Sequence, residues 1–426
     1  MRVTIKLEAS GLMDTINKEN MKVFVLAGGN DQIELIKGIR KRFKDVEVIL
    51  LDMNPNVRAR EYADRMLVIS TMDFDKVLKA AEDEKIDLIL SACGDQPLRT
   101  MAYVSEKLGL PCYLTYQQSL NLTNKVYMKD LMEQGGIPTA RFIRFDINTE
   151  ISCEGLTFPL VIKPADNNGS KGIIKVYSQS EFDEAIAEAK KYTLSGDLLV
   201  EEFKIGEEYS IEAFIKNGEP HIVFASKNIK IKDQNTFTIC KNEYVAELSK
   251  SLEEKIKRII KGIHNTFGID NVPLLIQMIY DGENVNVIEF SARTGGGSKL
   301  FFIREMTGVD VIENLLDITM GVDPDIQPKK KGRSAAILYA YAQPGIFNTV
   351  DGIDALQDKG IVDDIFLYKP YGSMINSSNY SSDRPLGLLI KAADEDELTE
   401  KIAVTNDTVK ILDENGNDIM RHEIFR

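Results

Sequence analysis

At 426 residues the chain exceeds the size at which a single hydrophobic core stops growing, so we expect two or three domains that share a cleft. Hydrophobic residues make up 43% and charged residues 28%, as in ordinary globular proteins, and no apolar stretch reaches the roughly 20 residues of a membrane helix. The net charge of −14 argues against a general nucleic-acid-binding protein, because affinity for phosphate chains needs accumulated cations.

Cysteine and histidine are too sparse for a metal or disulfide framework. The 4 cysteines lack CxxC spacing, and the 3 histidines are widely separated, which gives a zinc site little support. Residues 1–20 carry charges and no long apolar core, which argues against a secretory signal, and we treat them as an N-terminal extension. We therefore expect a cytoplasmic protein with reduced thiols, in which any metal is held by oxygen, as magnesium is.

The segment 21–120 alternates apolar runs with helical patterns. Strands are predicted at 21–27, 46–51 and 87–92, with a helix near 73–84. This order predicts an N-terminal α/β domain with a parallel sheet, in which ligands bind beyond the carboxyl ends of the strands.

Two residues follow such strand ends. Gly28 could serve only a tight turn, or its neighbourhood could bind an anion through backbone N–H groups. Asp95 could cap the next helix or face a ligand, and helix capping is the favoured interpretation. Both are therefore only candidates for substrate contacts.

A second unit is predicted at 121–330. It begins with an amphipathic helix at 124–135, which ends at Gly135-Gly136, and it contains further helices at 180–192 and 249–267. The Asp281-Gly282 turn is a strong hairpin signal between strands at 274–280 and 285–290. The other strands are predicted to form one antiparallel sheet: 160–163, 173–177, 198–203, 208–214 and 220–225.

The segment 331–426 is predicted to be a small C-terminal α+β module. It follows a basic linker near Pro328 and contains short strands at 335–341, 363–368 and 385–392, then a helix near 394–404.

Lys163 and the glycine-rich stretch after it are candidates for phosphate binding. Lys163 ends an apolar strand. Burying a lysine costs free energy unless an anion pairs with it, which makes Lys163 a candidate for binding phosphate. The alternative is a lysine at the sheet edge whose ammonium group reaches solvent. In Gly169-Ser170-Lys171-Gly172, backbone N–H groups could approach phosphate oxygens in a mobile loop, or the stretch could be a simple hairpin turn.

The hairpin near residue 280 carries candidate metal ligands. Gln277 and Glu289 could present two oxygen ligands on one face of the sheet, which Ser291 shares. Arg293 could neutralise charge on a transferring phosphoryl group. The alternative for Glu289 and Arg293 is a surface ion pair.

The order of these elements resembles the ATP-grasp superfamily from residue 21 to about 425. It looks closest to carboxylate–amine ligases related to L-amino acid ligases, carbamoyl-phosphate synthase and the formate- or carboxylase-type purine enzymes. The resemblance implies a parallel α/β pre-ATP-grasp domain at 21–120, an α+β ATP-grasp domain at 121–330 with a nucleotide lid at about 158–204, and the C-terminal module. It rests on Lys125, Lys163-Pro164, the glycine loop, Val200–Lys204, Gly206-Glu207-Glu208 and Glu289-x-x-x-Arg293.

The resemblance also implies roles for residues. Lys125 and Lys163 would contact the phosphates of ATP, Glu208 the ribose, and Gln277 and Glu289 a magnesium ion, with manganese as the substitute. Members usually place a carboxylate at the position of Gln277 and an asparagine at that of Ser291, so the number of metal ions stays open. The backbone that would read adenine belongs to Glu201, Glu202, Phe203 and Lys204.

The implied reaction is formation of an acyl phosphate from a carboxylate, followed by transfer to an amine, with Arg293, Lys163 and Glu289 as catalytic residues. Candidate substrate contacts are Gly28, Asp95, Gly296, Lys299 and Arg304; both cations could equally be exposed helix residues. The partners would be small-molecule carboxylates and amines, with a homodimer as the base expectation. The alternatives are a carboxylase-type enzyme, a kinase-like enzyme that releases the phosphorylated product, and a nucleotide-binding protein without turnover.

Overall fold

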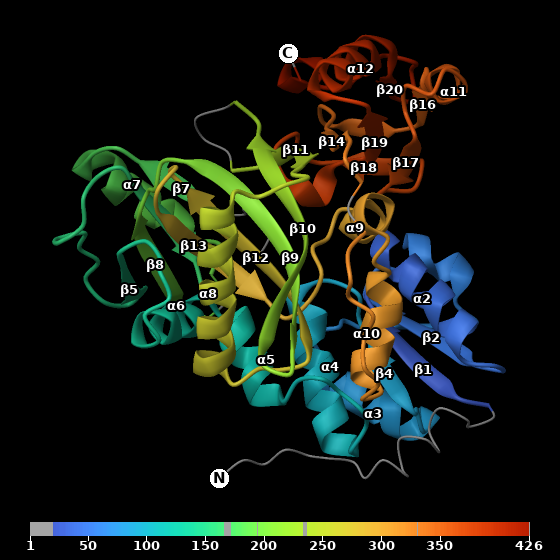
Figure 1. Ribbon diagram of the computed structural model, residues 1–426, viewed down its shortest axis with the longest axis horizontal. Coiled ribbons are helices and arrows are strands. Elements are labelled where there is room, and N and C mark those ends of the chain that lie inside the picture. Colours follow the sequence, from blue (N-terminus) through green and yellow to red (C-terminus); the bar gives the residue numbers. More distant parts are fainter. Residues whose placement is uncertain (1–19, 166–171, 194, 233–236, 330, 426) are drawn as a thin grey trace.

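The N-terminal part is a parallel four-stranded sheet with helices around it (Figure 1). The computed structural model describes residues 20–165, 172–193, 195–232, 237–329 and 331–425. The strands follow the order β3-β2-β1-β4, and β1 is almost wholly buried, as expected for a sheet covered on both faces. The predicted parallel α/β domain is therefore confirmed. Its elements are β1 Lys22–Leu26, α2 Asn30–Arg42, β2 Glu47–Asp52, β3 Arg65–Val68, α3 Phe74–Glu84, β4 Leu88–Leu90 and α4 Asp95–Leu108.

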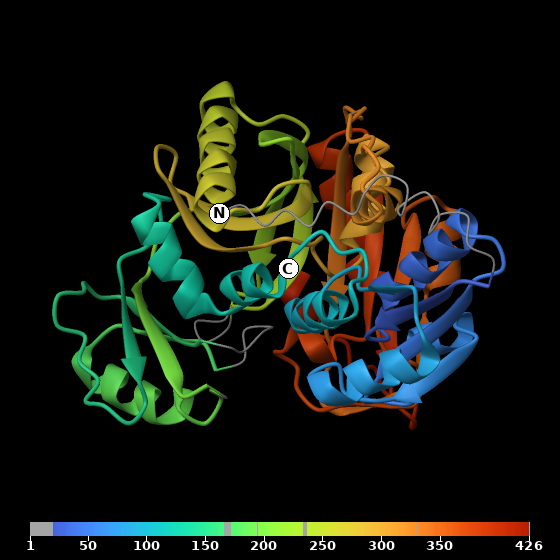
Figure 2. The same cartoon turned by 90° about the horizontal axis from the view of Figure 1, so that it is seen from below.

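A separate antiparallel sheet of order β5-β8-β6-β7 follows helices α5 (Tyr116–Thr123) and α6 (Lys125–Gln134). Helix α7 (Gln179–Ala189) packs on this sheet, and together they enclose a hydrophobic core of their own. In Figure 2 this green unit lies on one side of the molecule and the blue N-terminal sheet on the other. Its strands are β5 Phe142–Asp146, β6 Leu160–Pro164, β7 Ile174–Val176 and β8 Asp197–Glu202.

An eight-stranded antiparallel sheet of order β13-β12-β9-β10-β11-β14-β19-β17 forms the centre of the molecule. Helices α8 (Lys250–Phe267) and α9 (Lys299–Thr307) pack against β10, and α10 (Val311–Thr319) packs against α2 of the first domain. The strands are β9 Glu207–Lys216, β10 Glu219–Lys230, β11 Ile239–Tyr244, β12 Val272–Tyr280, β13 Val285–Ser291, β14 Ser334–Ala340, β17 Asp364–Leu367 and β19 Leu386–Ala392.

The prediction of one antiparallel sheet across 160–225 is wrong, because the chain changes sheets between β8 and β9. Gly206 lies at this change with φ of +152°, and a Cβ there would stand 2.5 Å from the carbonyl oxygen of Tyr280. Only glycine tolerates so close a backbone approach, which lets β9 start directly beside the end of β12.

The C-terminal segment contributes to the large sheet and also forms two small two-stranded sheets of its own, from residues 345–347 with 373–375 and 349–351 with 410–412. Its strands β14, β19 and β17 extend the eight-stranded sheet, because β14 pairs with β11. A smaller core lies under the remaining elements. The domain boundaries at 120 and 330 stay predictions. The remaining elements are β15 Gly345–Phe347, β16 Thr349–Asp351, α11 Ile353–Asp358, β18 Ser373–Ile375, α12 Glu395–Thr408 and β20 Lys410–Leu412.

Across the part of the chain that the structure describes, no helix is both long and apolar enough to span a membrane.

Candidate active site

A cavity of about 320 Å³ is lined by residues from both antiparallel sheets and from the first turns of α4, α6 and α9. This volume lies at the small end of the usual range for small-molecule sites. The cavity brings together most of the residues predicted from the sequence: Asp95, Lys125, Lys163, Glu201, Glu202, Phe203, Lys204, Glu208, Gln277, Glu289, Arg293, Gly296 and Lys299.

Lys163 belongs to a buried cluster of two lysines and one glutamate. Its Nζ lies 2.8 Å from Oε2 of Glu201, and Nζ of Lys129 lies 3.1 Å from Oε1 of the same carboxylate. Burial acts to raise the pKa of Glu201, but the charges of Lys129 and Lys163 outweigh it and lower the pKa to about 2. The anion that meets Lys163 in this structure is thus a protein carboxylate, which fixes the lysine at the cavity wall.

Glu208 is held by two side chains of the neighbouring strand β10. Asn228 donates from Nδ2 to Oε1 of Glu208 at 2.8 Å, and Nζ of Lys230 lies 2.5 Å from Oε2. All three residues line the cavity. The carboxylate therefore faces the space where the resemblance would place a ribose.

Gln277 and Glu289 are directly opposite each other on β12 and β13, so they share one face of the sheet, as predicted. A register shift between Gln277 and Met278, which was not predicted, produces this pairing. Both line the cavity, where the Glu289 side chain is 40% exposed and lies 3.8 Å from Nζ of Lys125. Within the described residues, no group of three or more His, Cys, Asp or Glu side chains could hold a metal. Two oxygen donors beside a phosphate site still fit magnesium, which keeps several ligands from water and phosphate.

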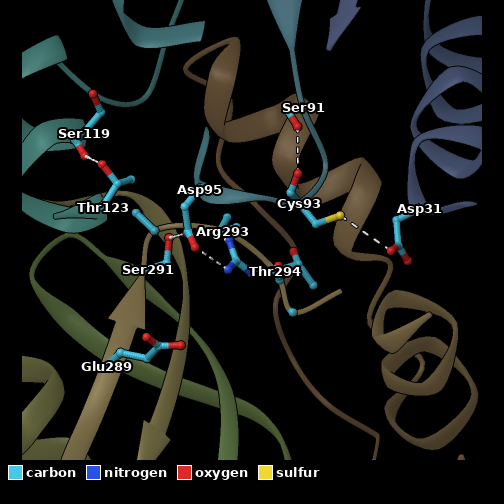
Figure 3. Close-up of polar contacts among 12 residues, drawn as sticks. Asp31, Ser91, Cys93, Asp95, Ser119, Thr123, Glu289, Ser291, Arg293 and Thr294 are labelled. Atoms are coloured by element: carbon cyan, nitrogen blue, oxygen red, sulfur yellow. Dashed lines mark hydrogen bonds and ion pairs between the residues drawn. The ribbon is translucent and has the colours of Figure 1, made fainter. Parts of the chain in front are cut away.

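Arg293 forms a bidentate ion pair with Asp95 (Figure 3). Its Nε donates to Oδ1 at 2.8 Å and its Nη2 to Oδ2 at 2.9 Å, while the Ser291 hydroxyl donates to Oδ1 at 2.8 Å. Although burial acts to raise it, the pKa of Asp95 is lowered, chiefly by the charge of Arg293. The favoured interpretation of Asp95 as a helix cap is therefore wrong: α4 begins after Gly94, and the carboxylate instead orients Arg293.

Lys299 reaches the cavity from the start of α9 and is paired with a buried glutamate. Its Nζ lies 3.8 Å from Oε1 of Glu212 and donates to the Ser210 hydroxyl. Glu212 also accepts the backbone N–H of Gly295. Burial lowers the pKa of Lys299 and raises that of Glu212. The alternative of an exposed helix cation is thereby excluded for Lys299.

Several predicted residues lie outside the cavity lining. The N–H of Gly28 donates to Asp52, and a Cβ at Gly28 would stand 2.2 Å from Val57, which favours the tight-turn role. Arg304 is 41% exposed and lies 3.6 Å from Glu34. Ser291 lines a smaller neighbouring cavity, and Gly172 packs against Tyr192 and Pro164. Gly169, Ser170 and Lys171 lie outside the described residues.

Some residues of the site were missed from the sequence. Lys129 follows Lys125 by four residues on α6, a spacing that puts both on one helix face and could have indicated it. The other missed residues lie on strands, or next to one, whose positions depend on long-range pairing. No local sequence pattern identifies them: Asn228, Lys230, Asn242, Tyr339 and Arg384.

Comparison with known protein families identifies the fold around this cavity. A family model described as an ATP-grasp domain matches residues 156–300, which include β6, β8, β12 and β13. The chain therefore contains an ATP-grasp domain over these residues. A model described as the PylC-like N-terminal domain matches residues 23–111 of this ATP-grasp chain.

Curated relatives and solved structures agree with this assignment. The ATP-grasp chain is 24% identical to a phosphoribosylamine–glycine ligase of Lactococcus lactis, over 75% of this chain and 80% of the relative. It is similar in fold to the L-amino acid ligase of Bacillus licheniformis, with a TM-score of 0.76, 20% identity, and coverage of 93% of this chain and 100% of the other.

A further structural relative is the biotin carboxylase domain of a Hydrogenobacter thermophilus 2-oxoglutarate carboxylase, solved with magnesium, ADP and bicarbonate. Its TM-score is 0.74 at 14% identity, with coverage of 96% of this chain and 93% of that domain. The predicted ATP-grasp fold and the kinship with carboxylate–amine ligases, which form C–N bonds with ATP, are therefore confirmed.

Proposed function

We propose that this ATP-grasp protein activates a small carboxylate or amino acid as an acyl phosphate and transfers the acyl group to an amine, forming an amide or peptide bond. One observation carries the proposal: a single cavity holds Lys163, the Gln277–Glu289 pair and an arginine aimed by Asp95. Phosphoryl transfer requires these parts together, because it depends on positioning and on charge stabilisation.

The residues of the chain have distinct tasks in this reaction. Lys125 and Lys163 bind phosphate oxygens, and Glu201 keeps Lys163 in place. Gln277 and Glu289 would hold magnesium, which when bound neutralises phosphate charge. A substrate carboxylate oxygen attacks the γ-phosphorus and ADP leaves. Arg293 meanwhile stabilises the transferring group, and Asp95 keeps its guanidinium in a fixed orientation.

In the second step, the amine attacks the acyl carbon and inorganic phosphate leaves. Water must be excluded until then, because an acyl phosphate hydrolyses in an open site. We assign this task to the region 158–204, whose sheet has its own hydrophobic core and can therefore move as a unit. Manganese as a substitute, a homodimer and a cytoplasmic location stay predictions.

The test is ADP release by the purified protein with Mg-ATP across a matrix of carboxylates and amines, each alone and in pairs. We expect ADP only with a particular pair. ADP release with a carboxylate alone would indicate a kinase-like enzyme, and ADP release with bicarbonate and an acceptor would indicate a carboxylase-type enzyme. Nucleotide binding without any turnover would favour a regulator.

Asp95→Asn should lower kcat about 100-fold and leave the KM for ATP nearly unchanged. The amide cannot supply the charge that holds Arg293, so the guanidinium loses its orientation toward the transferring group. Steady-state kinetics with the pair found above measures both constants. The matched control is Asp75→Asn, at an exposed aspartate on α3, which should behave as wild type. Equal loss in both variants would contradict the assignment.

A further inference from the structure

Arg384 lies in the stretch just before β19 and reaches the same cavity as the nucleotide residues. Its guanidinium stacks on two aromatic rings, 4.1 Å from the centroid of Tyr339 and 4.6 Å from that of Tyr368. The two rings are inclined by 48° to each other, and both attract the cation and restrict its position. No local sequence pattern distinguishes this residue.

The other cations that line the cavity are all paired. Each has a carboxylate oxygen at ion-pair distance, so its charge is already balanced within the protein. These paired cations are Lys125, Lys163, Lys204, Lys230, Arg293 and Lys299.

Among the residues that the structure describes, Arg384 is the only basic side chain of the cavity wall without a carboxylate at ion-pair distance. The adjacent Asp383 is paired with Lys369 instead, at 3.3 Å. Asp31 and Arg384 attract each other electrostatically. The carboxylate of Asp31, however, accepts the N–H of Ser298 and does not line the cavity. Within the described residues, Arg384 thus has a hydrogen bond with Tyr341 but no carboxylate at ion-pair distance.

Space for the guanidinium is provided by Gly297. Its φ is +77°, and a Cβ there would stand 2.6 Å from Nη2 of Arg384. The Tyr339 hydroxyl is fixed beside it, since it donates to Oδ1 of Asn242 at 2.6 Å. The surroundings of Arg384 thus restrict its movement, and a guanidinium with five N–H groups can still donate to a ligand in the cavity besides its bond with Tyr341.

We propose that Arg384 binds an anionic group of the amine substrate, namely the carboxylate of an amino acid. This inference rests on the proposed ligase function. The carboxylate that is activated must lie near Glu289 and Arg293, so a second anion at Arg384 belongs to the acceptor. A phosphate group would use the same chemistry, because both anions match the guanidinium fork.

The test measures binding rather than turnover. Isothermal titration calorimetry would be run with each of the twenty L-amino acids and with inorganic phosphate, in the presence of magnesium and a non-hydrolysable ATP analogue. We expect an amino acid to bind wild-type protein and to bind Arg384→Met about 100-fold more weakly, as for loss of a charge-assisted pair. Arg384→Lys should be intermediate, because lysine keeps the charge but not the fork.

Two controls separate a lost contact from a damaged fold. Arg258→Met removes an exposed arginine of α8 and should leave amino-acid binding unchanged, and both methionine variants should bind the ATP analogue like wild type. On wild-type protein, converting the α-carboxylate of the bound amino acid to an amide should weaken binding as much as Arg384→Met does.

The outcomes are distinct. Equal amino-acid affinity in wild type and Arg384→Met, or no binding of any of these probes, would overturn the proposal. If inorganic phosphate binds and no amino acid does, the proposal that Arg384 binds an amino-acid carboxylate is overturned. Arg384-dependent binding without ADP release from any pair would mean that the ligase function fails and the anion site stands. If ADP release depends on a pair and Arg384→Met leaves the KM for the amine unchanged, the ligase function stands and the proposed anion site at Arg384 fails.

Discussion

Replacing Glu289 by glutamine is expected to lower ADP release by roughly 1,000-fold, a loss typical of removing one preorganised charge from an active site. The candidate metal ligands are Gln277, Glu289 and Ser291, and only Glu289 carries a charge. Its substitution therefore leaves these ligands without a negative charge. Lys125, 3.8 Å away, also loses the charge of this neighbouring carboxylate. Steady-state ADP release at increasing magnesium concentrations would show a lower kcat and a weaker dependence on the metal.

The fold should tolerate this change, because the Glu289 side chain is 40% exposed to the cavity. The matched control is Glu283→Gln, at an exposed glutamate in the turn of the same hairpin, which should keep full activity and the same thermal midpoint. If Glu289→Gln retains more than a tenth of wild-type turnover, Glu289 does not have the proposed role of holding magnesium.

Glu201→Gln should destabilise the protein by about 3–5 kcal/mol, the range for breaking a buried ion pair by removing one partner. Two cations depend on this carboxylate: Lys163 at 2.8 Å and the 2% exposed Lys129 at 3.1 Å. Because the chain has no tryptophan, far-UV circular dichroism during urea titration is the suitable measurement. Adding Lys129→Met to Glu201→Gln should recover part of the loss, since an apolar side chain replaces an unpaired buried charge.

The control for this loss is Glu188→Gln on α7, a glutamate whose side chain is 44% exposed and is paired with Lys191, which should change stability by less than about 1 kcal/mol. A loss in Glu201→Gln no larger than in this control would show that the two lysines are stabilised in another way.

Acid should remove the contribution of Glu201. Its pKa is lowered from 4.5 to about 2 in the folded protein, so the carboxylate stabilises the fold fully above the unfolded pKa of 4.5. This contribution declines as the pH falls from 4.5 toward 2, because the unfolded state then binds more protons than the folded state. The difference in unfolding free energy between wild type and Glu201→Gln should shrink over that interval.

Local sequence patterns were enough to predict much of the nucleotide site. The apolar run before Lys163 placed it at the end of a strand, and the hairpin turn near residue 281 placed Gln277 and Glu289 on paired strands, as the strand pairing confirms. Strand alternation and turn chemistry act over a few residues, so they can be read without knowing the rest of the fold.

The tertiary structure decided what those patterns do not contain. Asp95 and Arg293 are 198 positions apart, and Arg384 meets the cavity only because β14 pairs with β11 and carries β19 into the large sheet. By itself the sequence determined the fold class, the strand that bears Lys163 and the hairpin that bears Gln277 and Glu289, but not the register shift that sets these two residues opposite each other. Which carboxylate orients Arg293, and which arginine is left to bind a substrate, follows from long-range strand pairing, because contacts between distant segments leave no local periodicity in the chain.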